Sequence, residues 1–232
     1  MKASFSRRAT IWPVILLLVF ALWGTLCYAE EPLSKESVCY GTTSKGRLEN
    51  GVQLPTSGKN FQPYSRVLAG VGRTYVHSRV GAVVVNAYAA LEESLPGKTF
   101  VYGETGWAVG GRIKPHKTHQ NGLSVDFMVP VVDAHGDAVP LPTSPFNKYG
   151  YGIDFDPKGR FKEGGLRIDF EALAAHLKTL HLEARKAGID IWRVIFDPRL
   201  QPLLYRTKDG PYLKANLLIP TKRSWVRHDD HY

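Results

Sequence analysis

The sequence predicts an α+β fold, in which a small antiparallel β-sheet is accompanied by flanking helices and long loops. Two observations favour this class over a doubly wound parallel sheet. Strand-like segments follow one another without a helix between each pair, and several connections are long and rich in Pro and Gly. The length of 232 residues and the hydrophobic content of 44% are sufficient for one buried core.

The first half of the chain alternates between polar and apolar segments. Residues 30–60 are polar, which predicts an extended arm with turns. Apolar residues recur every three or four positions over 80–94, which predicts a helix ended by the Pro-Gly pair at 96–97. The β-branched and aromatic residues of 99–102 predict a strand, and the alternating pattern of 123–132 predicts a second one.

The second half contains the longest predicted loop and the strongest predicted helix. Residues 139–165 are rich in Pro, Gly and Asn and predict a surface loop. An apolar face with helical spacing predicts a helix over 169–188. The apolar run 191–196 predicts a buried strand, 197–204 a short helix, and 224–232 a final strand.

The N-terminus has the pattern of an export signal. Basic residues precede an almost unbroken apolar run over 11–26, and Cys27-Tyr28-Ala29 then places small residues where a signal peptidase cuts. We expect residues 1–29 to be a cleaved signal peptide and residues 30–232 to be one exported domain without a stable membrane span. The alternative is an uncleaved anchor, because the apolar run is long enough to cross a bilayer.

The charge of the chain limits the classes of binding partner, and its cysteine content limits the possible disulfides. The formal net charge is +9, and it falls to +6 when the signal peptide is removed, because three basic residues and no acidic residue are lost. A basic exported protein is attracted to polyanions such as the cell wall. We expect no nucleic-acid partner, since no Lys/Arg run with interleaved aromatic residues is present. Cleavage also leaves Cys39 as a single cysteine, so no internal disulfide can form.

A cluster of histidines and a carboxylate is the strongest functional signal. His116, His119 and Asp126 lie within eleven residues, with Gly122 allowing a turn between them, and His228 and His231 follow near the C-terminal end. Imidazole and carboxylate groups are zinc ligands, and a catalytic zinc site combines three of them with a water. Taken alone, His119 and Asp126 could also be a hydrogen-bonded pair that holds no metal.

The wider pattern resembles the penicillin-insensitive murein endopeptidases, which are exported zinc peptidases of the LAS group. The residues that carry the resemblance are Gly110, Gly111, Arg112, His116, His119, Gly122, Asp126, Trp225, His228 and His231. The resemblance implies an LAS-peptidase-like fold, a periplasmic location and zinc-dependent hydrolysis of the peptide cross-links of peptidoglycan, of the murein DD-endopeptidase type. The bond cleaved in that family is typically the one between D-alanine and diaminopimelate.

The resemblance also implies roles for single residues. His119 and Asp126 would bind zinc, and His116 would lie beside the metal as an alternative ligand. His231 would act as a general base or stabilise the transition state, and His228 would support it. The third ligand of the family would match position 233, beyond the sequence, and we therefore expect a catalytic domain truncated at its C-terminus. The alternative is a non-catalytic cell-wall-binding homologue that lacks this ligand.

Overall fold

The computed structural model describes residues 35–161, 163–222 and 228–232. The helices are α1 (Arg66–Gly70), α2 (Ser78–Ser94), η1 (Pro145–Gly150, a 3-10 helix), α3 (Phe170–Lys186), α4 (Gln201–Leu204) and α5 (Gly210–Asn216). The strands are β1 (Val38–Thr42), β2 (Lys45–Glu49), β3 (Val52–Gln53), β4 (Phe61–Pro63), β5 (Tyr75–Val76), β6 (Phe100–Tyr102), β7 (Val131–Val132), β8 (Ala138–Val139), β9 (Arg160–Phe161) and β10 (Leu166–Ile168).

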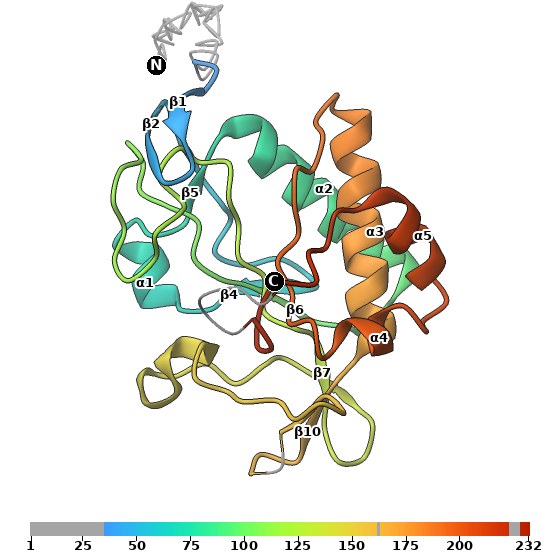
Figure 1. Cartoon of the computed structure of the whole chain (residues 1–232). Helices are drawn as coiled ribbons and strands as arrows, with labels where there is room; N and C mark the ends of the chain where they lie inside the picture. The colour runs from blue at the N-terminus through green and yellow to red at the C-terminus, as the bar shows by residue number, and fades with distance from the viewer. Residues whose placement is uncertain (1–34, 162, 223–227) are drawn as a thin grey trace, which may run out of the picture. The chain divides into compact units, whose positions relative to one another are not determined.

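Helices combine with small sheets, so the fold is α+β as predicted. The largest sheet among the described residues has the order β8-β7-β10-β9 and is antiparallel. β1 pairs with β2 and β3 with β5, also antiparallel, whereas β4 and β6 are parallel. The segment from β7 to β10 forms a layer apart from the two long helices, on the far side of β4 and β6 (Figure 1).

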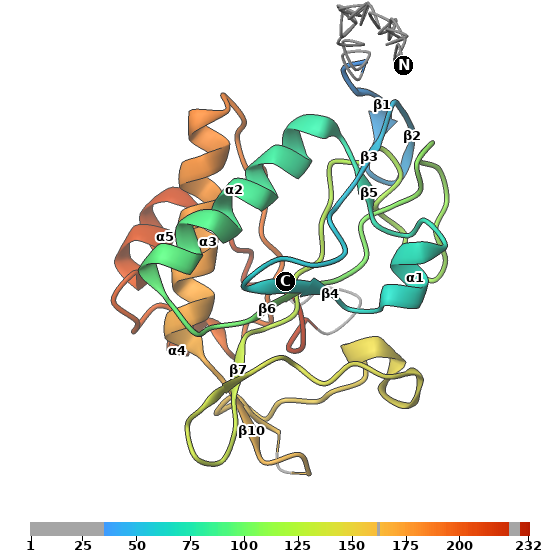
Figure 2. The same ribbon diagram turned by 180° about the vertical axis from the view of Figure 1, so that it is seen from behind.

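The two long helices lie side by side and cover the same side of β6 (Figures 1 and 2). Both were predicted from their apolar periodicity. The α3 helix begins where the Asp169 side chain accepts a hydrogen bond from the Ala172 amide, which satisfies a free N–H group of the first turn. It ends before Gly188, whose φ of 64° lies in the left-handed region that favours glycine.

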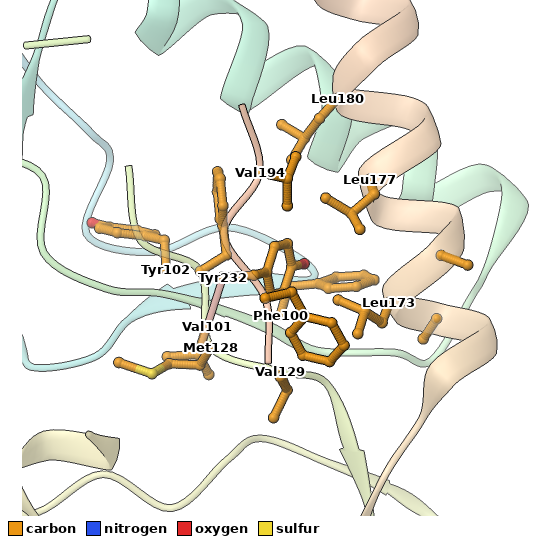
Figure 3. Close-up of a cluster of buried hydrophobic side chains, with 14 of the residues drawn as sticks. Phe100, Val101, Tyr102, Met128, Val129, Leu173, Leu177, Leu180, Val194 and Tyr232 are labelled. Atoms are coloured by element: carbon orange, nitrogen blue, oxygen red, sulfur yellow. The ribbon is translucent and has the colours of Figure 1, made fainter. Parts of the chain in front are cut away.

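The core connects these helices to the last described segment of the chain. Leu173 and Leu177 of α3 point toward Phe100 of β6 and toward Tyr232 (Figure 3). Each fully buried side chain of this kind contributes roughly 1.5–3 kcal/mol to folding. The backbone of Tyr232 also exchanges two hydrogen bonds, both of 2.9 Å, with the backbone of Phe127. The packing of Tyr232 therefore fixes the position of its neighbour His231.

A buried histidine in this core predicts loss of stability in mild acid. His176 stacks on Tyr88, with ring centroids 5.2 Å apart, and its Nδ1 contacts the hydroxyl of Tyr232. Burial lowers the pKa of His176 to about 3. Because an unfolded histidine has a pKa of about 6.5, the unfolded chain binds a proton that the folded chain excludes, and stability falls as the pH drops below about 6.5.

We expect His176→Phe to reduce this loss. Between about pH 6.5 and about pH 5, the free energy of unfolding of the wild type should fall by about 2 kcal/mol more than that of the variant. Denaturant unfolding of both proteins at the two pH values measures the difference. The same loss in both proteins would contradict the prediction.

Several elements differ from the prediction. In 123–132 only β7 is a strand, because the extended segment before it bonds in turn to Val101, Tyr232 and other partners through isolated bridges. Residues 191–196 do not form a buried strand. Val194 donates a hydrogen bond to the carbonyl of Leu218 and is buried, as is Phe196, whereas Trp192 is 70% exposed. One face of this segment therefore packs on the core, although the segment is not a strand.

Other segments have more structure than expected. The predicted polar arm contains the β1–β2 hairpin, and the predicted loop 139–165 contains η1, β9 and the buried residues Ile153 and Phe155. The expected signal peptide and the first part of the expected last strand, residues 224–227, lie outside the described residues. Within the described ranges, no helix combines the length and the apolar character needed to span a bilayer.

Candidate metal centre

Three of the residues singled out from the sequence come together in the structure. His116, His119 and Asp126 each offer one ligand atom, and these atoms lie within 4.8 Å of one another. Nε2 of His119 is 3.2 Å from Oδ1 of Asp126, and Nδ1 of His116 is 3.7 Å from Oδ2 of the same carboxylate. This group could therefore hold a metal ion.

Backbone pairing positions Asp126 at the end of β6. The amide of Gly103 donates to the Asp126 carbonyl at 2.6 Å, and the Asp126 amide donates to the carbonyl of Glu104 at 3.0 Å. The extended segments around Gly103 and Asp126 thus run beside each other, which brings the side chains of Glu104 and Asp126 to the same site. Any larger residue at position 103 would crowd Asp126, because a Cβ there would lie only 3.0 Å from the Asp126 Cβ.

The loop that carries the two histidines is held in an unusual backbone conformation. His119 has a φ of 70°, which is uncommon for a residue other than glycine. Its neighbour Gln120 donates a backbone hydrogen bond to Thr43 of the β1–β2 hairpin and accepts one from Gly111. These contacts compensate for the strained geometry and fix the His119 side chain, which is 3% exposed.

Each histidine of the group has one nitrogen engaged away from Asp126. Nδ1 of His119 lies 3.2 Å from the carbonyl oxygen of Ser124, and Nε2 of His116 lies 2.7 Å from Oε2 of Glu104. An acceptor at one ring nitrogen places the proton there and leaves the other nitrogen free to bind a metal. The donor set and its supporting contacts therefore fit a divalent transition metal such as zinc.

Glu104 also belongs to the centre, through its contact with His116. It is 2% exposed, and Oε1 accepts hydrogen bonds from Arg73 and from the Tyr64 hydroxyl. Burial alone would raise the pKa of Glu104, but the hydrogen bonds from His116 and Arg73 outweigh it, so the pKa is lowered. Glu104 is therefore a carboxylate that holds His116 in place.

The charges of His119 and Asp126 favour each other's ionised forms. Burial would raise the pKa of Asp126, but the charge of His119 and its hydrogen bond lower it well below the usual value. In the same way burial would lower the pKa of His119, and Asp126 raises it above the usual value. The carboxylate is thus ionised and available as a ligand at neutral pH.

Tyr151 also reaches this centre and was missed by the sequence analysis. Its hydroxyl donates to Oδ2 of Asp126 at 2.9 Å and accepts a hydrogen bond of 2.9 Å from the amide of Glu104. Burial, followed by the negative charge of Asp126, raises the pKa of Tyr151 well above its usual value. Tyr151 lies in the predicted surface loop, and no local sequence pattern marks it.

The two C-terminal histidines lie next to each other beside the group. The rings of His228 and His231 have centroids 4.5 Å apart, and the ring of His231 is 4.8 Å from that of Tyr151. Nδ1 of His231 contacts Oδ1 of Asp230. Burial would lower the pKa of His231, but the hydrogen bond with Asp230 and the charge of Asp126 raise it.

Two adjacent acidic residues, Asp229 and Asp230, most simply indicate an exposed turn, and the alternative is that Asp230 orients a histidine; the structure has both residues buried and Asp230 in contact with His231. They are 1% and 4% exposed. Asp229 accepts a hydrogen bond from the Phe155 amide at 3.0 Å, and Asp230 contacts His231. The Asp229 carboxylate therefore helps to fix the C-terminal segment against the loop that contains Phe155, and the Asp230 carboxylate helps to hold the His231 ring.

Comparison with known proteins agrees with the resemblance seen in the sequence. The family model described as penicillin-insensitive murein endopeptidase matches residues 39–143. No curated protein matches the chain. The matched segment contains Glu104, His116, His119 and Asp126, whereas Tyr151 and His231 lie beyond it. Residues 39–143, which carry the three grouped ligands, are therefore similar to the penicillin-insensitive murein endopeptidase family.

Proposed function

We propose that this protein is an exported, zinc-dependent endopeptidase that hydrolyses the peptide cross-links of peptidoglycan, of the murein DD-endopeptidase type. The observation that supports it most strongly is the group formed by His116, His119 and Asp126, whose ligand atoms lie within 4.8 Å of one another. The family match supports the substrate. The export pattern of residues 1–29 supports a periplasmic location, where this substrate lies.

In this proposal Nε2 of His119, Nδ1 of His116 and the carboxylate of Asp126 hold the metal. When bound there, zinc would polarise a peptide carbonyl and make water a nucleophile near neutral pH. The protein's own contribution is orientation. Ser124 and Glu104 hold the outer nitrogens of the two histidines, so that neither ring has to turn when the metal binds.

His231 is proposed as the group that transfers a proton during peptide hydrolysis. Asp230 contacts Nδ1, which holds a proton at that nitrogen and leaves Nε2 for exchange with the reacting groups. Because its pKa is raised, His231 is protonated to a greater extent at a given pH than an ordinary histidine, and the protonated form can stabilise a developing oxyanion or protonate the leaving amine. His228, in ring contact with His231, is proposed as its support.

Digestion of purified cross-linked muropeptide dimers tests the proposed reaction. We expect the protein to convert dimers to monomers, a chelator to stop this conversion, and added zinc to restore it, because the ligand group would be empty without metal. Chromatography of the products measures the rate. Mass spectrometry of the same products identifies the bond that is cleaved.

The control is the same digestion with uncross-linked monomers, which should remain unchanged. Cleavage that persists in chelator would contradict the metal requirement. Binding to cross-linked peptidoglycan without cleavage, in protein loaded with zinc, would favour the non-catalytic cell-wall-binding homologue instead.

A further inference from the structure

The hydroxyl of Tyr151 is held in one orientation, in which it points its proton at the carboxylate of Asp126. It accepts a hydrogen bond from the backbone amide of Glu104, which is itself held by the pairing with Asp126. A phenol has one proton, and at this site the proton goes to Oδ2 of Asp126. One oxygen of the carboxylate is thereby engaged, while Oδ1 faces Nε2 of His119 at 3.2 Å.

The side chain of Asn147 connects several parts of the loop that presents Tyr151. Oδ1 of Asn147 accepts hydrogen bonds from the amides of Ser144 and Gly150, at 2.9 and 3.0 Å, and its Nδ2 donates to the carbonyl of Pro142 at 2.8 Å. Because these hydrogen bonds already order the backbone of the loop, fixing the Tyr151 side chain costs little additional conformational entropy. The position of Tyr151 is therefore built into the fold.

The ring of Tyr151 is packed from several sides. Its centroid is 6.0 Å from that of Tyr64, 5.3 Å from that of His116 and 4.8 Å from that of His231, each in an edge-on arrangement. The backbone beneath the hydroxyl has to be glycine, because a Cβ at Gly103 would lie 2.6 Å from the Tyr151 oxygen. The ring cannot turn away without displacing two histidines of the site.

We infer that Tyr151 is a positioning residue of the metal centre, which fixes the rotation of the Asp126 carboxylate and directs Oδ1 toward the face shared with His119. The inference rests on the proposed zinc site. It extends the site beyond the segment that matches the family, since residue 151 follows residue 143. The hydroxyl acts through Asp126, and the remainder of the ring maintains the packing.

The test is the affinity of the purified full chain for zinc alone, measured by competition with a chromophoric chelator. Tyr151→Phe removes the hydroxyl and keeps the ring. We expect it to weaken zinc binding by about 10- to 100-fold, the loss typical of residues that orient a metal ligand. The visible spectrum of the cobalt-substituted protein should also change, because the carboxylate is freed to bind the metal differently.

Tyr149→Phe is the matched control, since Tyr149 lies in the same loop and packs edge-on against Tyr64 at 6.1 Å. It should leave affinity and spectrum unchanged. Equal affinity and equal spectra in the wild type and Tyr151→Phe would overturn the inference and leave the proposed function intact. Equal losses in both variants would assign the effect to the loop and also overturn it. A wild type that binds no zinc would overturn the proposed metal site itself.

Discussion

Replacing His119 or Asp126 with alanine is expected to remove most of the bound zinc and to lower cross-link cleavage by more than about 100-fold, beyond the loss typical of supporting residues. The structure gives the reason. Each side chain supplies one of three ligand atoms, and catalytic zinc normally requires three protein ligands. Removing one leaves a pair that holds the metal loosely.

Each substitution also changes the ionisation of the ligand that remains. Without Asp126, His119 loses the carboxylate that raises its pKa, and without His119 a buried carboxylate loses its main compensating charge. Metal analysis after dialysis and digestion of muropeptide dimers measure the two losses. His135→Ala is the control, because His135 is an exposed histidine in the β7–β8 turn. Zinc content equal to wild type in both variants would refute the ligand assignment.

The second large effect is expected at His231, where the metal should remain. His231→Ala should lower kcat by about 10²- to 10⁴-fold, as is usual when a group that transfers protons is lost. The zinc affinity should stay within a few fold of the wild type, because the ligand group of His116, His119 and Asp126 is intact. The two readouts together separate a proton-transfer role from a ligand role.

Steady-state kinetics of dimer cleavage and chelator competition on the same preparation provide the measurement. The main structural risk is the adjacent Tyr232, whose backbone bonds to Phe127 and whose ring lies in the core. Thermal unfolding of the variant should therefore be compared with that of the wild type. A loss of zinc together with activity in a normally folded variant would identify His231 as a ligand and refute its proposed catalytic role.

Local patterns in the sequence were sufficient for the parts of the site that lie close together in the chain. The spacing of His116, His119 and Asp126 predicted a cluster because one turn can bring them to one point, and the structure has them together. The helices α2 and α3 were predicted because their buried positions repeat with the helical period. These features depend on neighbours within a few residues.

The parts that the sequence did not establish depend on contacts between distant segments. Glu104 and Tyr151 join the centre only because 103–104 pairs with Asp126 and the loop after η1 folds back over it. An exposed turn was the simplest prediction for Asp229 and Asp230, with Asp230 orienting a histidine as the alternative. Both are buried, since Asp229 accepts a hydrogen bond from the Phe155 amide and Asp230 contacts His231. The apolar run 191–196 resembled a core strand. Val194 and Phe196 do pack in the core, but Trp192 is exposed and the segment is not a strand, because strand pairing depends on partners that the run itself does not encode.

The distance along the chain between the residues of this centre has a consequence for the choice of metal. Glu104, His119, Tyr151 and His231 come from segments that meet only when the domain has folded. The three proposed ligands lie close together in the chain, but in the unfolded polypeptide they lack these supporting contacts, so metal affinity and folding are linked. A chain exported before it folds would therefore acquire its metal from the pool outside the cytoplasm, and the compartment of folding would determine which ion it carries.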